Sequence, residues 1–379
     1  MRADLHTAPP TAARRVDEPA DANHAEPPSA AREPAPARLV RAAELVRRGL
    51  ADAADLPALA DVEAHLAVGV SPAMLARIER PHDPIGLQFI PDVRELTIAE
   101  AERADPVGDH HHTVVPGLVH RYRDRALVKP THLCAVYCRF CFRRDVVGDP
   151  AHATLSPEAL AAVLAEIRAR PEIWEVILTG GDPLVLAPSR LAPILDALRQ
   201  IPHVRVIRIH TRVPLVAPER VTDALVDLLR RHAPVWLVLH ANHPREFTPP
   251  GLAACAALVD AGVPMLSQSV LLKGVNDDLD VLERLLRTFV EQRIKPYYLH
   301  HADLVEGTSH LRVPLSAGRR LIRGLRDRVS GLCMPLYVLD IPGGFGKVPA
   351  DAAWISGPDE HGAWQVTDRR GAVHDYREP

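Results

Sequence analysis

This sequence of 379 residues has no strong excess of charge, no long apolar run and few cysteines. A formal net charge of −3 gives no support to a nucleic-acid partner or an anionic membrane surface. No stretch approaches the roughly 18 uncharged apolar residues of a membrane helix, and the N-terminus lacks the apolar core of a secretory signal. We therefore expect a cytoplasmic protein with reduced thiols and no disulfide framework.

Composition and periodicity divide the chain into four segments. Residues 1–37 are rich in Pro, Ala, Arg and Glu, which predicts a disordered tail. Apolar residues at helical spacing predict a helical region over 38–110, with Ser71 placed as an N-cap. The main domain is expected over 111–335, and a glycine-rich turn with an irregular, polar tail over 336–379. The histidines at 110–112 are expected to be exposed, because adjacent histidines cannot all face one metal ion.

Strand-like and helix-like patterns alternate through the main domain. The β-rich runs are 125–134, 174–182, 204–212, 235–242, 264–272 and 295–303, and the helical patterns between them lie near 156–169, 189–200, 218–231, 250–262 and 278–292. A further helix is expected over 316–330 and a strand over 336–340. This alternation predicts parallel βαβ units, so we expect an α/β fold, a partial (βα)6 TIM-like barrel. Active sites of such barrels lie at the C-terminal ends of the strands, where His210 and His240 are also found.

Three of the five cysteines lie in one short run after the first of these strands. Cys134, Cys138 and Cys141 are spaced C-x3-C-x2-C. Thiolates are the usual ligands of iron–sulfur clusters, and three of them would leave the fourth iron of a cubane open to a small chelating molecule. The alternative is a structural zinc site, for which Cys255 or Cys333 would supply the fourth ligand.

The cysteine run, with Phe140 before its last cysteine, resembles the radical S-adenosylmethionine (SAM) signature. The strand-terminal WEVILTGGDPL, with Gly180, Gly181 and Asp182, resembles the SAM-contacting turn of that superfamily. The resemblance implies a radical SAM barrel, a [4Fe–4S] cluster on Cys134, Cys138 and Cys141, and SAM on the open iron. It also implies a reducing electron donor of the flavodoxin or ferredoxin type.

A second glycine-rich segment, DIPGGFGK, ends in Lys347. Glycines allow close approach of the backbone to a ligand, and a lysine there is a candidate Schiff-base former. A solvated loop lysine is the alternative; a Walker A loop is excluded, because valine follows Lys347. In order along the chain, the cysteine run, the glycine turn, YYLHHADL and DIPGGFGK are similar to the lysine 2,3-aminomutase family, from about residue 83 to about residue 349.

This second resemblance implies an isomerase that moves the α-amino group of L-lysine to C3, giving β-lysine, with pyridoxal 5′-phosphate (PLP) carrying the nitrogen. The residues that would contact PLP are Lys347, Arg121, Tyr122 and Arg125. Arg143 would hold the substrate carboxylate, which suits a planar guanidinium. Asp303 and Asp340 would hold the distal ammonium group, and two such anions would repel the side chain of glutamate.

Several alternatives remain open from the sequence. Paired aspartates would also hold the guanidinium of arginine, and short relatives supply β-lysine for the modification of an elongation factor. A non-catalytic iron–sulfur redox protein would explain the cysteines but leaves Arg143, Asp340 and Lys347 without a role. The chain has no cysteine after Cys333, so it departs from the best-known relatives, which carry extra C-terminal cysteines for a structural zinc, and Arg123 replaces their usual proline. Homo-oligomers are expected by analogy alone.

Overall fold

The structure is a computed structural model that describes residues 40–148, 153–351, 353–361, 363–368 and 371–377. The prediction of a disordered tail at 1–37 lies outside these residues. Short helices begin the described chain: α1 (Ala42–Arg47), α2 (Leu56–His65), α3 (Pro72–Leu75) and α4 (Gly86–Phe89). The Ser71 hydroxyl accepts a hydrogen bond from the backbone N–H of Met74, as an N-cap does. The predicted helical region is therefore present, in shorter pieces than its periodicity indicates.

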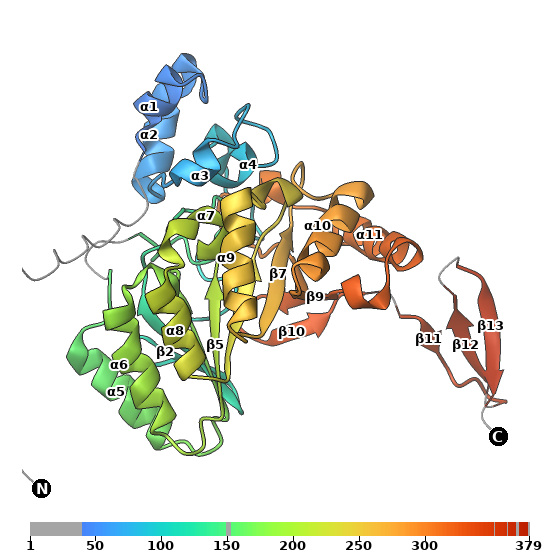
Figure 1. The fold of residues 1–379 in the computed structure, drawn as a ribbon. Helices are drawn as coiled ribbons and strands as arrows, with labels where there is room; N and C mark the ends of the chain where they lie inside the picture. The colour runs from blue at the N-terminus through green and yellow to red at the C-terminus, as the bar shows by residue number, and fades with distance from the viewer. Residues whose placement is uncertain (1–39, 149–152, 352, 362, 369–370, 378–379) are drawn as a thin grey trace, which may run out of the picture. The chain divides into compact units, whose positions relative to one another are not determined.

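Ten strands form one sheet whose order follows the chain from β1 to β10 (Figure 1). The strands are β1 (Thr113–Val115), β2 (Leu118–Tyr122), β3 (Arg125–Thr131), β4 (Glu175–Gly180), β5 (Val206–Thr211), β6 (Val235–His240), β7 (Met265–Leu271), β8 (Lys295–His301), β9 (Leu336–Ile341) and β10 (Gly346–Pro349). Neighbours from β3 to β9 pair in parallel, while β1, β2 and β10 add antiparallel edges. The α/β prediction is confirmed, with β9 as an additional parallel strand in the same sheet.

Helices connect the parallel strands: α5 (Pro157–Arg168), α6 (Pro188–Arg199), α7 (Val213–Val216), α8 (Asp223–Arg231), α9 (Pro249–Asp260), α10 (Leu279–Glu291) and α11 (Leu315–Arg328). Because strand order follows chain order, right-handed crossovers place the connecting helices on one face of the sheet, as Figure 1 shows. The opposite face is left to line the interior of the barrel. The longer helices pack against the outer face of the sheet, and buried apolar side chains from helices and strands form the hydrophobic core.

Helix α10 shows how the sequence sets these elements. Its buried side chains are Leu282, Leu285, Leu286 and Phe289, the spacing of one helical face. The Asp278 carboxylate caps its start by accepting hydrogen bonds from two backbone N–H groups. The helix stops before Arg293, whose φ of +60° lies in the left-handed region. Helix α8 differs from its prediction: it begins at Asp223, because Pro218–Arg220 forms a separate 3-10 turn.

The two ends of the sheet meet through loops and side chains. The backbone N–H of Gly343 donates to the carbonyl of Pro106 at 3.0 Å, and His112 Nε2 lies 3.1 Å from the carbonyl oxygen of Gly344. A Cβ on Gly108 would lie 2.7 Å from the Cα of Gly344, so this crossing needs glycine. His112 is therefore half-buried at this junction, unlike the exposed His110 and His111, and the prediction for the histidine run is wrong at its last member.

The prediction of an irregular C-terminal tail is also wrong. Strands β11 (Ile355–Ser356), β12 (Ala363–Thr367) and β13 (Val373–Arg377) form an antiparallel sheet of their own. Trp364 lies opposite Tyr376, and the Gln365 amide donates to Asp375 at 2.7 Å, so cross-strand pairs stabilise strands that have few apolar residues. Within the described chain, no helix has the length and apolarity needed to cross a membrane.

Candidate active site

A cavity of about 620 Å³, in the size range of small-molecule sites, opens inside the barrel. Every residue that the sequence analysis assigned to a cofactor or to the substrate lines it. These residues are Cys134, Cys138, Cys141, Gly180, Gly181, Asp182, Arg121, Tyr122, Arg125, Arg143, Asp303, Asp340 and Lys347. The fold thus brings together groups that lie more than 200 positions apart in the sequence.

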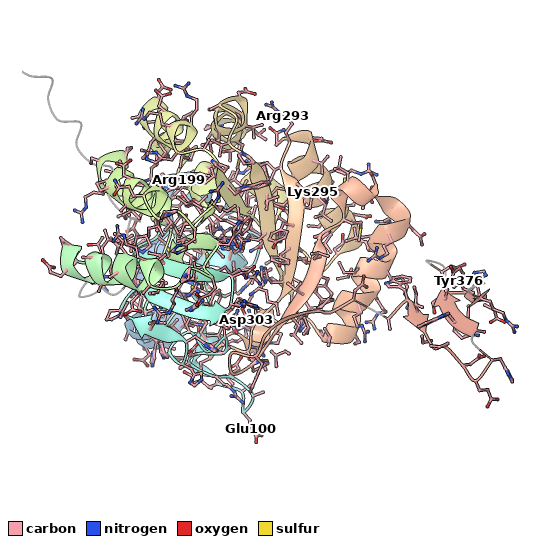
Figure 2. All side chains as sticks on the ribbon, turned by 90° about the horizontal axis from the view of Figure 1, so that it is seen from below. Glu100, Arg199, Arg293, Lys295, Asp303 and Tyr376 are labelled. Atoms are coloured by element: carbon pink, nitrogen blue, oxygen red, sulfur yellow. The ribbon has the colours of Figure 1, made fainter. Side chains whose placement is uncertain are left out.

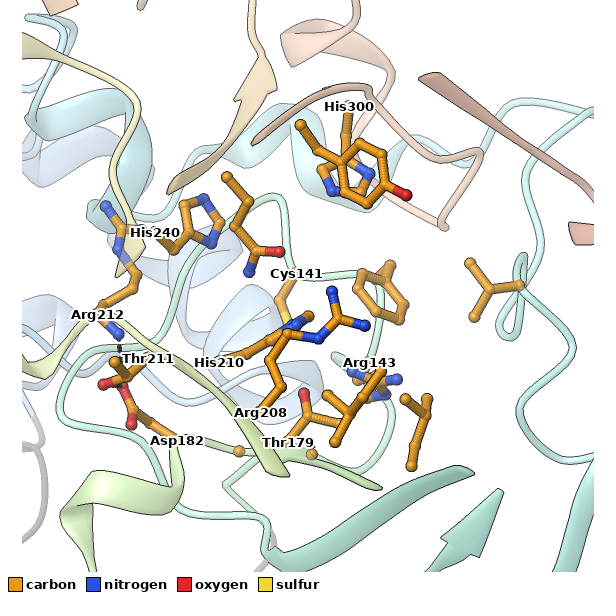
Figure 3. A pocket seen from close by; sticks show the side chains of 18 of the residues that line it. Cys141, Arg143, Thr179, Asp182, Arg208, His210, Thr211, Arg212, His240 and His300 are labelled. Carbon is orange, nitrogen blue, oxygen red and sulfur yellow. Dashed lines mark hydrogen bonds between the residues drawn. The ribbon is translucent and has the colours of Figure 1, made fainter. Parts of the chain in front are cut away.

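The turn after β4 holds the start of the cysteine loop. The backbone N–H of Gly181 donates to the carbonyl of Thr131 at 2.7 Å, and that of Asp182 donates to the carbonyl of Leu133 at 2.8 Å. A Cβ on Gly181 would lie 2.2 Å from that Leu133 oxygen, so only glycine permits this approach. The Asp182 carboxylate accepts from the Thr211 hydroxyl at 3.0 Å (Figure 3) and from the Arg212 N–H, which ties β4 to the end of β5.

A buried carboxylate anchors the other side of the loop. The Glu95 carboxylate accepts two hydrogen bonds from Arg139, of 2.9 and 2.6 Å, and one from Arg144, of 2.5 Å. Burial alone would raise the pKa of Glu95, but the two guanidinium groups hold it below its ordinary value. The carboxylate therefore stays charged and fixes the segment around Cys138 and Cys141 to the N-terminal region. Sequence reasoning missed Glu95, because a glutamate before TIAE carries no motif.

The three thiols of this loop face the cavity, and the desolvation that comes with enclosure raises the pKa of each, that of Cys141 to about 11. Positive charge is therefore needed to hold them as thiolates. In the described part of the chain, no three Cys, His, Asp or Glu side chains are close enough to share one metal ion. Cys255 and Cys333 lie buried in separate hydrophobic clusters. Neither of these two cysteines is among the residues that line the cavity, whereas three thiols there are the donor set of a cubane with one open iron.

The cavity also contains a cluster of charged groups from the last strands. Asp340 on β9 lies opposite Lys347 on β10, and Lys347 Nζ is 2.5 Å from Asp340 Oδ2. Arg121 Nη2 lies 3.3 Å from the other carboxylate oxygen, and the backbone N–H of Lys347 donates to the Tyr122 hydroxyl at 2.9 Å. Lys347 was expected in a loop; it lies on a strand, where β-pairing fixes its direction.

Asp303 follows β8 and lies between the first strands of the sheet and the last (Figure 2). Burial raises the pKa of Asp303 to about 7, and the nearby charge of Asp340 adds to the effect. Arg143 also lines the cavity (Figure 3), and its Nε donates to Asp109 Oδ2 at 2.6 Å. Sequence reasoning missed Asp109, which looked like part of a linker.

Three histidines at strand ends complete the polar wall: His210, His240 and His300 (Figure 3). Burial lowers the pKa of all three, that of His300 to about 3, with the positive charge of Lys347 contributing. They are therefore neutral near pH 7 and can accept as well as donate hydrogen bonds.

A barrel of parallel strands with three cysteines and a glycine turn at one mouth is the architecture of radical SAM enzymes, and residues 128–286 match the Radical SAM superfamily. The chain is 40% identical over 316 residues to an L-lysine 2,3-aminomutase of Clostridium subterminale, covering 83% of this chain and 76% of that protein. It is 37% identical over 282 residues to a glutamate 2,3-aminomutase of Clostridioides difficile, covering 74% and 66%. A radical SAM methyltransferase structure from Sphaerobacter thermophilus aligns with a TM-score of 0.43 at 22% identity, over 62% of this chain and 73% of that one.

The chain belongs to the lysine 2,3-aminomutase family. It is a radical SAM 2,3-aminomutase, an isomerase whose family implies a [4Fe–4S] cluster, SAM and an amino acid substrate.

Proposed function

We propose that this enzyme acts on L-lysine and moves its α-amino group to C3, giving β-lysine. The observation that carries this choice is the pair of carboxylates, Asp303 and Asp340, in one enclosed cavity. Burial, with the nearby charge of Asp340 adding to it, raises the pKa of Asp303 to about 7, and this supports a cation as the group that binds there. The ammonium group of lysine would relieve that repulsion, whereas the carboxylate of glutamate would add to it.

The other residues have roles that follow from their positions. Arg143, with its Nε held by Asp109, can offer its two terminal nitrogens to the substrate carboxylate. Arg125 and Arg121 flank the Tyr122 ring, at 4.2 and 5.0 Å from its centroid, and form a cationic patch suited to a phosphate group. These placements support a substrate that is held at both ends.

Lys347 fits as the PLP-binding residue, because it is a lysine on a strand paired with β9 and lines the same cavity as the thiols. PLP bound there would supply the π-system that carries the migrating nitrogen. Cys134, Cys138 and Cys141 would hold the cluster, which with SAM supplies the carbon radical. The protein's own contribution is to orient lysine between Arg143 and the carboxylates and to exclude water from the cavity.

The test is a substrate competition with full-length protein, reconstituted anaerobically with iron, sulfide, SAM and PLP. Lysine, glutamate and arginine are supplied at equal concentration with a chemical reductant, and the β-amino acids are separated by chromatography. We expect β-lysine as the main product. A preference for glutamate or arginine would overturn the substrate assignment. Lys347→Ala, which should lose both the PLP absorbance and turnover, controls for the site.

A further inference from the structure

Arg212 is a buried cation that the proposed mechanism does not use. It follows β5, and its guanidinium contacts three different groups. Nη1 donates to the sulfur of Cys138 at 2.9 Å, while Nη2 donates to Glu246 at 2.6 Å and to Gln88 at 3.0 Å. Its side chain is 7% exposed and that of Glu246 is fully buried.

The groups around Arg212 fix its position. The Glu246 carboxylate accepts from the backbone N–H groups of Asn242 and His243, at 2.8 and 3.0 Å. The Gln88 side-chain amide donates to Glu246 at 3.2 Å, and the backbone carbonyl of Gln88 accepts from the backbone N–H of Arg139 in the cysteine loop. A guanidinium held by so many partners cannot turn away from the sulfur without leaving buried charges unpaired.

We propose that Arg212 is a positioning residue that raises the reduction potential of the cluster through its hydrogen bond to Cys138. The inference rests on the proposed function only in that Cys138 ligates the cluster. On reduction the cluster accepts one electron from an external one-electron reductant and becomes more negative by one charge. A cation that donates to a ligating sulfur stabilises this more negative form, and hydrogen bonds to the sulfurs are a known determinant of cluster potentials.

Glu246 provides a matched perturbation of opposite sign. Arg212→Gln removes the positive charge and leaves the negative one, so the cluster should become harder to reduce. Glu246→Gln removes the negative charge and leaves Arg212 beside the sulfur, so the cluster should become easier to reduce. General damage to the site would not separate the two variants in this way. Arg208→Gln is the control, because Arg208 lies on β5 shortly before Arg212, lines the same cavity and pairs with a glutamate, Glu175, at 2.9 Å.

The experiment uses full-length protein reconstituted with iron and sulfide. Iron and sulfide are counted per chain, and the reduced cluster is followed by electron paramagnetic resonance during titration with titanium(III) citrate. We expect Arg212→Gln to shift the reduction equilibrium at least tenfold toward the oxidised cluster, which is about 59 mV for one electron. Glu246→Gln should shift it toward the reduced cluster, and Arg208→Gln should change it less than either.

The outcomes separate the inference from the function on which it rests. A wild-type chain that binds no cluster would overturn the proposed function. Variants that bind a full cluster at the wild-type potential would overturn the role of Arg212 alone. If Arg212→Gln does not retain a cluster, the double variant with Glu246→Gln restores the charge balance and should still have a lower potential than the wild type. If the double variant also retains no cluster, the Glu246→Gln variant tests the inference. A reduction potential equal to or lower than that of the wild type in this variant would contradict it.

Discussion

Replacing Asp303 with asparagine should stabilise the fold at alkaline pH while weakening the binding of lysine. The pKa of Asp303 is about 7 in the folded protein against an ordinary 3.8, because burial and the charge of Asp340 oppose its ionisation. Since the folded pKa lies above the unfolded one, the folded state binds the extra proton between these values. Stability should therefore fall as pH rises from about 4 to 7 and stay lowered above 7.

The pKa difference sets an upper limit for the effect. At 1.36 kcal/mol per pKa unit it corresponds to roughly 4 kcal/mol at pH 8. Asp303 is half-buried, and water in the cavity screens part of this energy, so we expect a gain of about 2 kcal/mol for Asp303→Asn at pH 8. The gain should be smaller at pH 5, where the wild-type carboxyl is mostly protonated. Urea unfolding of both proteins at the two pH values measures it. Lower stability of the variant at pH 8 would refute the reasoning.

The same ionisation should govern the pH dependence of substrate use. An ammonium group needs a charged partner, so kcat/KM for lysine should rise with pH up to about 7 and then level off, with a tenfold change per pH unit on the acid side. In Asp340→Asn the rise of kcat/KM with pH should occur at lower pH, because the charge that helps raise the pKa of Asp303 is gone. An unchanged rise in that variant would show that another group titrates.

Three further predictions concern the supports of the site. Glu95→Gln leaves two buried arginines without their anion and should destabilise the fold by about 3–5 kcal/mol in urea unfolding; an unchanged midpoint would contradict the anchoring role. Asp109→Asn should raise KM for lysine about tenfold or more with a smaller change in kcat, because Arg143 loses a charged partner; steady-state kinetics test this, and a selective loss of kcat would argue against it. Gly181→Ala should reduce the iron bound per chain, whereas Gly331→Ala, with open space around it, should not; equal iron contents would discount the close approach.

The sequence predicts the barrel well, because its strands and helices are long and strongly periodic. All six predicted strands of the main domain are present, and the residues named for the site share one cavity. Motifs located those residues, since spacing in a loop or a glycine turn reflects local chemistry. Lys347 could be named in this way, but its place on β10 could not, because only pairing with β9 makes that segment a strand.

The supporting residues were hidden because their partners are distant in the chain. Glu95 meets Arg139 44 positions later, and Asp109 meets Arg143 34 positions later, so neither pair forms a local pattern. The C-terminal sheet was missed for a different reason. Its strands alternate weakly between apolar and polar residues, and backbone pairing rather than burial organises them.

The most direct test of the account is the transfer of hydrogen from lysine to the adenosyl group, which requires both cofactor sites to share the cavity. Reconstituted protein is incubated with SAM, PLP, a reductant and L-lysine deuterated at C3, and the adenosyl products are analysed by mass spectrometry. We predict that deuterium enters the adenosyl group of the wild-type reaction and that Lys347→Ala prevents this transfer. SAM cleavage without deuterium in the adenosyl group, by a protein with a full cluster and bound PLP, would contradict the shared site.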